Sequence, residues 1–318
     1  GILLLLGVYK GGIFGGSIPA ILLRIPGTPA GIATVFDGHE MAKQGKARQA
    51  LDISLVSSSI GSAVSAVVLL LVAPPLALVA LTFGPADYFW LAVFGMTTIA
   101  IMLAGNPAKG ILSACFGLCI GIVGIDGISG NERFTFGTVE FLSGIHIVVL
   151  LTGLYAIPPA IDLLLGKNAI QAGDVDLGEA AKGFRWSSLV PTWIRASAIG
   201  LVVGLIPALG GNIAALLAWQ EERRYSRNKD NWGKGEPAGL AAPECANNAE
   251  TSGALLPFLT LGIPGSALIA MLGGAFLLHG LEPGPLLFEE HGDKIYALYC
   301  GLIAINLVML AIGLSGMN

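Results

Sequence analysis

The chain has 318 residues, of which 54% are apolar and only 12% are charged, with a mean hydropathy of +0.76 and a net charge of −4. Such a composition excludes an ordinary soluble domain, whose charged fraction is about twice as high. The small, scattered net charge also lacks the basic stripe of a nucleic-acid-binding protein. We therefore expect a multi-pass membrane protein whose surroundings are the lipid bilayer, with no nucleic-acid partner.

Uncharged stretches of bilayer-spanning length recur along the chain. A membrane-spanning helix needs about 20 predominantly apolar residues. Pro74 and Pro75 predict a kink or a split in the first long stretch, because proline interrupts helical hydrogen bonding. The predicted spans lie near 55–82, 87–104, 109–125 and 141–165, with another beginning at 187 and a final apolar segment after Lys294.

Positive charges are unevenly distributed among the polar loops. Three loops, 38–50, 166–186 and 220–250, carry most of the Lys and Arg residues, so the positive-inside rule places all three in the cytoplasm. Four spans separate the first loop from the second, and an even number returns the chain to the same side. The predicted organisation is a first repeat half with its following transmembrane helices at 1–165, a cytoplasmic linker at 166–186 and a second repeat half at 187–318.

An internal repeat is the clearest organisational signal. Two tetrapeptides match one another: Ile25-Pro26-Gly27-Thr28 and Ile263-Pro264-Gly265-Ser266. Each is preceded by a run of apolar and small residues, and these runs begin at Gly15 and at Gly253. A helix does not continue through such a Pro-Gly pair, and non-helical backbone at membrane depth must be buried in protein or line a wet cavity. The predicted fold is an all-α polytopic membrane protein with an internal repeat and two Pro-Gly-broken hairpins of the re-entrant kind that marks a transporter's binding site.

The two predicted breaks suit an acidic substrate and a cation. The N-terminal end of a half-helix attracts carboxylates, whereas exposed carbonyls with Ser, Thr and Asn oxygens coordinate sodium. The candidate substrate- and ion-binding residues are Ser17, Arg24, Pro26, Gly27 and Thr28 at the first break, and Asn247, Asn248, Thr251, Ser252, Pro264, Gly265 and Ser266 at the second, with Thr34 and Thr260 nearby. The alternative is that small residues only let helices pack closely, as expected for the GxxxG pairs Gly117/Gly121 and Gly200/Gly204.

Several charged residues allow two interpretations. Arg24 interrupts an otherwise uncharged stretch from 11 to 36, where a guanidinium suits a carboxylate, unless it reaches from the membrane edge to water. The same choice applies to three charges that are expected where a hairpin meets the aqueous boundary: Lys10, Asp37 and Glu244. His146 and His279 are interpreted as structural rather than as proton relays.

Enzyme motifs are absent from the sequence. It contains no GxxxxGK[ST] phosphate loop, no GxSxG elbow and no HExxH helix. We therefore expect no catalysis, no ATP hydrolysis and no bound cofactor or metal centre, so that energy comes from an ion gradient or from another subunit. A channel or a non-transporting structural subunit is the alternative function.

Six sequence blocks together resemble the TctA family, the large permease subunits of the tripartite tricarboxylate transporters. The blocks are GGSIPAILLRIPGTPA at 15–30, the following DG with MAKQGKARQAL to 51, NERFTFG at 131–137, GLIPALGG at 204–211, GEPAGLAAPECANNAETSGALLPFLTLGIPGSA at 235–267 and HGLEPGPLLF at 279–288. They cover both ends and the middle of the chain in the family's order.

The resemblance implies a permease of the bacterial inner membrane. It implies two partners, a small TctB-like membrane subunit and a periplasmic TctC-like solute-binding protein that delivers the substrate. It also implies uptake of citrate or a related di- or tricarboxylate, driven by a sodium or proton gradient, with Na⁺ as the candidate coupling ion. The chain departs from the family's aromatic-rich YYGxxYGGS at Val8, Lys10 and Phe14. It also has Arg24 at a position where the family often has Asn. These differences leave the identity of the substrate open.

The sequence also leads us to expect a piece of a longer polypeptide. No initiator Met and no basic segment precede the apolar stretch at Gly1–Leu6. The family carries an early copy of the GLIPALGG-like element, and the repeat offset places a partner for Pro207 before Gly1. The first half is therefore expected to be incomplete at its N-terminus and the second half at its C-terminus.

Overall fold

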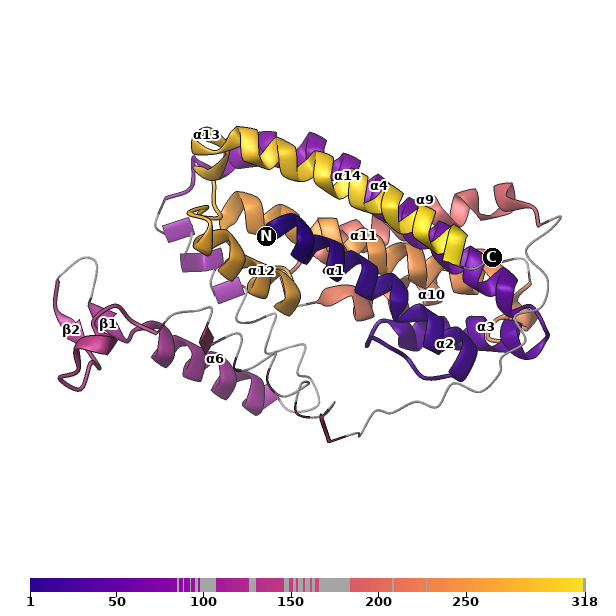
Figure 1. The fold of residues 1–318 in the computed structure, drawn as a ribbon, viewed down its shortest axis with the longest axis horizontal. Coiled ribbons are helices and arrows are strands. Elements are labelled where there is room, and N and C mark those ends of the chain that lie inside the picture. Colours follow the sequence, from indigo (N-terminus) through magenta and orange to yellow (C-terminus); the bar gives the residue numbers. More distant parts are fainter. Residues whose placement is uncertain are drawn as a thin grey trace.

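The computed structural model describes residues 1–84, 107–125, 130–145, 184–207, 209–226 and 228–316, with scattered residues between 86 and 97 and between 149 and 165. Helices make up most of this part of the chain (Figure 1). Several sequence-based expectations fall wholly or largely outside the described residues: the spans 87–104 and 141–165, the linker 166–186 and His146.

The first half holds the helices α1 (Ile2–Gly15), α2 (Ser17–Leu23), α3 (Gly31–Lys43), α4 (Ala47–Ala80) and α6 (Pro107–Gly121), with η1 (Val139–Phe141). The strands β1 (Gly124–Ile125) and β2 (Glu132–Arg133) pair antiparallel, with Gly124 opposite Arg133. This short ribbon qualifies the all-α prediction. The second half holds η3 (Trp186–Leu189), α9 (Val190–Leu205), α10 (Gly210–Tyr225), η4 (Lys229–Asn231), α11 (Pro237–Leu261), α12 (Ala267–Leu278), α13 (Leu287–Glu290) and α14 (Gly292–Gly316).

Helix α4 is one continuous helix of 34 residues that includes Pro74 and Pro75. Of the two predicted outcomes, a kink or a split, the split is wrong. The fixed φ of proline is itself helical, and membrane helices tolerate the lost N–H bonds where neighbouring groups satisfy the freed carbonyls. At about 1.5 Å per residue the helix is roughly 50 Å long, which exceeds the thickness of the hydrocarbon core.

Helix α11 is the centre of the bundle, with residues 239–260 buried without interruption. Helices α4, α9 and α10 pack around it, because glycines remove the side chains that would keep the backbones apart. A Cβ on Gly61 of α4 or on Gly200 of α9 would overlap the carbonyl oxygens of Cys245 and Ala246, and one on Gly204 would lie 2.7 Å from the Glu250 carbonyl oxygen. The predicted close packing at Gly200 and Gly204 is confirmed. A Cβ on Gly117 or Gly121 would meet no described atom within 4 Å.

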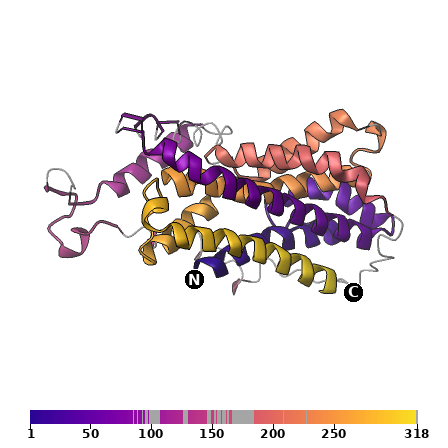
Figure 2. The same ribbon diagram turned by 90° about the horizontal axis from the view of Figure 1, so that it is seen from above.

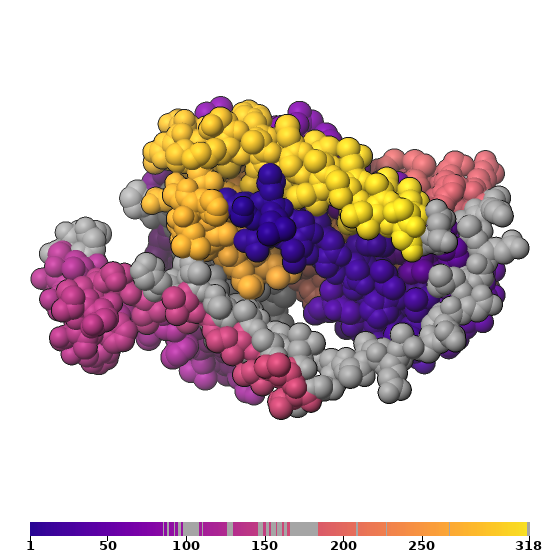
Figure 3. All heavy atoms as spheres, viewed as in Figure 1, coloured from indigo at the N-terminus to yellow at the C-terminus, as the bar shows by residue number. Residues whose placement is uncertain are grey.

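The outer surface is apolar, as lipid contact requires. Within the described residues, four helical segments are long and apolar enough to cross a membrane: Ile2–Leu23, Ala47–Ala80, Trp186–Leu205 and Gly292–Gly316. Helix α14 runs beside α4 (Figure 2), and α1, α12 and α14 share one face of the molecule (Figure 3). Leu4 and Ile312 on this face are 72% and 65% exposed. These helices therefore make the chain a multi-pass membrane protein.

Candidate functional site

The first Pro-Gly break lies between α2 and α3. Helix α2 ends at Leu23, and Arg24 follows in the left-handed conformation with φ 60°. The Ile25 N–H then donates to the Pro19 carbonyl at 3.2 Å, a bond that closes the helix end as in a Schellman motif. The chain turns through Pro26, Gly27 and Thr28 before α3 begins at Gly31.

The second break repeats this backbone geometry between α11 and α12. Gly262 follows Leu261 in the left-handed conformation with φ 74°, and the Ile263 N–H donates to the Pro257 carbonyl at 3.3 Å. Each donor follows its acceptor by six residues, and each acceptor is a proline. The left-handed residue is Gly in one break and Arg24 in the other, although left-handed backbone costs a residue with a Cβ about 1–2 kcal/mol.

The glycine of each Pro-Gly pair packs against backbone. The Gly27 N–H donates to the Gly16 carbonyl at 3.1 Å, and a Cβ on Gly27 would lie 2.7 Å from the Gly16 Cα. A Cβ on Gly265 would lie 2.8 Å from the Cα of Ala254 in α11 and 2.9 Å from the Gly204 carbonyl oxygen. Both turns therefore require glycine for close approach rather than for a positive φ.

A buried carboxylate links the first hairpin to the central helix. Glu244 of α11 accepts hydrogen bonds from Thr34 of α3 and, at 2.9 Å, from Ser58 of α4. Ser54 of α4 also bonds to Glu244 and lies 2.7 Å from Ser17 of α2, hydroxyl to hydroxyl. Three helices thus meet at one carboxylate, α2 is joined to it through Ser17 and Ser54, and its oxygens are well supplied with donors.

A second carboxylate, Glu250, lies farther along α11 in a cluster with opposite charges. It interacts electrostatically with Lys10 of α1, and both residues are only 1% exposed. The Lys10 ammonium lies 3.5 Å from the Ser252 hydroxyl, and the neighbouring Tyr9 hydroxyl bonds to Ser266 at the second break. This cluster therefore joins α1 to the middle of α11 and to Ser266 at the start of α12.

Some buried polar atoms of α11 and of the first turn have no partner among the described residues. The buried Oε1 of Glu250, Oδ1 of Asn248 and Oγ1 of Thr28 make no hydrogen bond with any described residue. A buried polar atom without a partner costs about 1–3 kcal/mol. Unsatisfied oxygens on α11 and at the first turn are thus suited to a cation or to a ligand that donates hydrogen bonds, whereas Lys10 suits an anion.

The other predicted residues fall into two groups. Asn247 is buried on the side of α11 that faces Gly211 of α10, and Thr251 and Thr260 donate to carbonyls of their own helix, at 2.8 Å each. Ser266 caps α12 by accepting from the Ile269 N–H at 3.4 Å. Exposed residues outside the clusters are Arg24, Pro26, Gly27, Pro264 and His279.

The side chains of Lys10, Asp37 and Glu244 are all buried in the protein, so none of them reaches into water. Sequence reasoning also missed four members of the clusters, Tyr9, Ser54, Ser58 and Glu250. A signal for Glu250 was available, since it follows Glu244 by six positions in the block 235–267 that contains the second predicted break. Ser54 and Ser58 are four residues apart, which places them on one face of a helix.

Asp37 of α3 holds the N-terminal end of α11. Its Oδ1 accepts from the backbone N–H groups of Gly233, Gly235 and Glu236 at 2.8–3.1 Å, and its Oδ2 accepts from the Trp219 indole at 2.9 Å. Burial, together with the negative charge of Asp37, raises the pKa of the Glu236 carboxyl above its usual range. Asp37 therefore acts as a clamp between the first hairpin and the central helix.

We expect Asp37→Ala to destabilise the protein by roughly 3 kcal/mol, because four donors lose a charged acceptor in a buried place. The measurement is the midpoint of thermal unfolding in detergent. Glu40→Ala on the same helix is the matched control, since Glu40 makes a partly exposed i,i+3 pair with Lys43 and should change stability by less than about 1 kcal/mol. Equal midpoints for the two variants would contradict the clamp.

Comparison with known proteins identifies the family. The model of the "Tripartite tricarboxylate transporter TctA family" matches residues 1–318. The chain is 34% identical over 319 residues to an "Uncharacterized 52.8 kDa protein in TAR-I ttuC' 3'region" of Agrobacterium vitis. The aligned part is 98% of this chain and 62% of the relative.

A second relative from the same organism, an "Uncharacterized protein in TAR-II ttuC' 3'region", is 36% identical over 115 residues, which is 36% of this chain and 48% of the relative. The chain thus spans less than two thirds of the length of these curated relatives. No solved structure gives a significant match. The family match over the whole chain confirms the resemblance found in the sequence blocks, and the chain belongs to the tripartite tricarboxylate transporter TctA family.

Proposed function

We propose that the chain forms the substrate-handling part of the large permease subunit of a tripartite transporter, which imports citrate or a related di- or tricarboxylate across the bacterial inner membrane. The small TctB-like subunit and the periplasmic TctC-like binding protein are its proposed partners. Family membership supports this proposal, and the observation that carries it is the shared backbone geometry of the two Pro-Gly breaks beside the buried clusters of α11.

The two breaks are proposed to be re-entrant hairpins of an internal repeat. Pro19 and Pro257, Arg24 and Gly262, and Gly27 and Gly265 are each separated by the same sequence offset and play the same backbone roles. Transporters with repeats of this kind bind substrate where interrupted helices of the two halves meet. Rocking of one half against the other would then give alternating access.

The proposed division of labour follows from charge. The positive end of the α3 dipole and the Lys10 ammonium attract the acid, since α3 begins without a side-chain cap. The carboxylates and the unsatisfied oxygens of α11 attract the coupling cation, sodium or a proton. The opposite charges lie close enough to interact, so binding of the acid and of the cation would favour one another.

The test is uptake of radiolabelled citrate into proteoliposomes that contain the full-length permease and its small subunit, with the cognate binding protein outside. An inward sodium gradient is compared with an inward proton gradient and with no gradient. We expect saturable, gradient-dependent uptake. The same vesicles, preloaded with unlabelled acid, should also show counterflow.

A linear, non-saturable flux would support a channel, and no flux of any carboxylate by demonstrably folded protein would support a non-transporting scaffold. Either result would overturn the proposal. Uptake of another di- or tricarboxylate instead of citrate would support the proposed permease function and identify a different substrate.

A further inference from the structure

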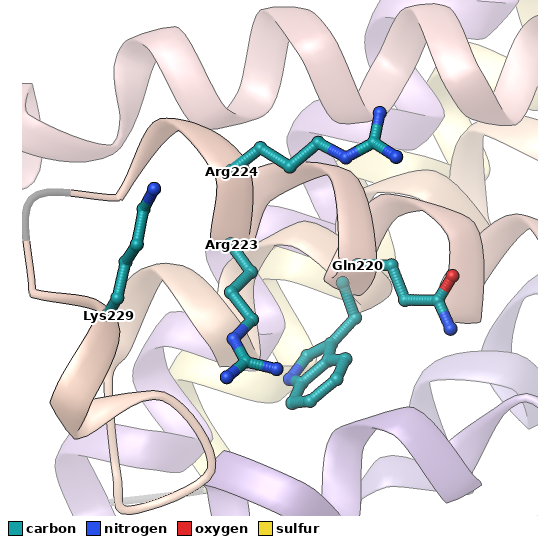
Figure 4. Close-up of a pocket in the computed structure, with 5 residues that line it drawn as sticks. Gln220, Arg223, Arg224 and Lys229 are labelled. Atoms are coloured by element: carbon teal, nitrogen blue, oxygen red, sulfur yellow. The ribbon is translucent and has the colours of Figure 1, made fainter.

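A basic pocket lies away from the hairpins, where the C-terminal end of α10 approaches η4. Its volume is about 400 Å³, and it is lined by Trp219, Gln220, Arg223, Arg224 and Lys229 (Figure 4). Neither of the buried clusters contributes a residue to this lining. The pocket therefore needs an explanation of its own.

The aromatic wall of the pocket is held in place before any ligand binds. The Trp219 indole donates to Asp37 at 2.9 Å. Its ring centroid lies 4.9 Å from that of Phe36 and 5.7 Å from that of Trp232. A side chain fixed on three sides loses little entropy when a ligand packs against it, which favours binding.

The charges of the pocket are only partly compensated. Arg224 pairs with Glu221 at 2.8 Å, and the adjacent Glu222 is bound to Arg195 at 2.6 Å. Arg223 and Lys229 are exposed and make no ion pair with any carboxylate of the described chain, including Asp230 beside Lys229. Figure 4 shows Arg223 on α10 and Lys229 on the segment that follows it. Two uncompensated cations thus line the same pocket as the fixed indole.

We propose that this pocket binds the phosphate group of an anionic lipid headgroup. A guanidinium and an ammonium in the lining of one pocket suit a phosphate, which accepts several charge-assisted hydrogen bonds. Tryptophan favours the membrane–water interface, where one part of its ring is in lipid and the N–H is in a polar setting. The pocket lies within the predicted cytoplasmic loop region 220–250, the side on which basic pockets meet anionic headgroups.

Arg223 also lies in the last turn of α10, at the negative end of the helix dipole, which its charge offsets. An anion here would therefore bind to side chains rather than to the helix end, so that neutralising the side chains should remove binding. A soluble phosphate shares this chemistry, and the experiment separates the two sources. The proposal does not depend on transport, because it is tested by binding alone.

The experiment titrates the purified full-length permease in detergent with phosphatidylglycerol, phosphatidylcholine or inorganic phosphate and follows the thermal unfolding midpoint. We expect phosphatidylglycerol to raise the midpoint, and phosphatidylcholine, whose choline compensates its phosphate, to have little effect. The double variant Arg223→Gln/Lys229→Gln should weaken the apparent affinity for phosphatidylglycerol at least fivefold. Inorganic phosphate should compete only weakly with the lipid.

The matched control is Lys46→Gln/Lys234→Gln, which removes two exposed positive charges from the same predicted side of the membrane and should leave the affinity within twofold. Equal affinity of the wild type and the Arg223/Lys229 variant would overturn the proposal. A midpoint that responds to inorganic phosphate and not to phosphatidylglycerol would keep the phosphate site and reject the lipid as its occupant.

Discussion

Uptake by the permease is expected to fall roughly tenfold or more when either Gly27 or Gly265 is replaced by alanine. The added Cβ would lie 2.7 Å from the Gly16 Cα in one variant and 2.8 Å from the Ala254 Cα in the other. Backbone cannot move aside as the end of a flexible side chain can, and overpacking costs about 1–3 kcal/mol. Because about 1.4 kcal/mol corresponds to a factor of ten, distortion of either turn should be measurable in the rate.

The measurement is the initial rate of substrate uptake into proteoliposomes at equal amounts of folded permease. Gly15→Ala and Gly292→Ala are the matched controls, since a Cβ at either position would meet no described atom within 4 Å. Both controls should retain uptake close to that of the wild type. Normal uptake by Gly27→Ala and Gly265→Ala would sink the proposal that the two turns shape the transport site.

The positions of the two breaks follow from local sequence, and their geometry follows only in part. The Pro-Gly pairs predict where each helix is interrupted, but α2 and α11 end at Leu23 and Leu261, before the prolines are reached. A left-handed residue and a bond back to Pro19 or Pro257 close these helices. Gly262 signals such an end, whereas Arg24 does not, because left-handed arginine is stabilised by its surroundings and not by its own preference.

The membership of the buried clusters was harder to predict, because it depends on which helices meet. Lys10 and Glu250 are far apart in sequence and come together only when α1 packs against α11. From the sequence alone, Asp37 and Lys10 were both open to two interpretations, a functional charge inside the membrane or a charge at its edge. In the structure the Asp37 carboxylate accepts hydrogen bonds from backbone N–H groups at 233–236 and from the Trp219 indole. Periodicity identifies a face of one helix, whereas the partner of that face is a tertiary property.

The polarity of α11 was visible in the sequence but its position was not. The segment 235–267 is rich in Gly, Pro, Ser, Thr and Asn, which is unusual for a membrane segment. Such residues suit an element that is enclosed by protein rather than by lipid, and residues 239–260 are indeed buried on all sides. The apolar helices α1, α4 and α14, by contrast, expose leucine, valine and isoleucine on the outside of the bundle.

Neutralising one member of the Lys10–Glu250 pair is expected to destabilise the permease by about 1–3 kcal/mol, because each buried group loses the opposite charge with which it interacts. Lys10→Met leaves the Glu250 charge buried without its opposite, and Glu250→Gln does the same to the Lys10 ammonium. Removal of one partner of a buried ion pair in direct contact typically costs about 3–5 kcal/mol, which is the upper limit here, whereas replacement of both is often tolerated. The double variant Lys10→Met/Glu250→Gln should therefore recover most of the lost stability.

Stability is measured as the unfolding midpoint of the full-length permease in detergent, over the complete double-mutant cycle. The exposed pair Glu40 and Lys43, 2.7 Å apart, supplies the control cycle, in which Lys43→Met and Glu40→Gln should each change the stability by less than about 1 kcal/mol. Additive effects of Lys10→Met and Glu250→Gln would show that the two charges are not coupled.

The same double variant separates a structural role of the pair from a role in transport. If Lys10 and Glu250 only hold α1 against α11, then a folded Lys10→Met/Glu250→Gln permease should take up substrate at a rate near that of the wild type. If they bind the acid and the coupling cation, uptake should fall at least tenfold although the protein remains folded, because both charges that attract the ligands are gone. We expect the second result, since Glu250 Oε1 and Asn248 Oδ1 on the same helix have no partner among the described residues.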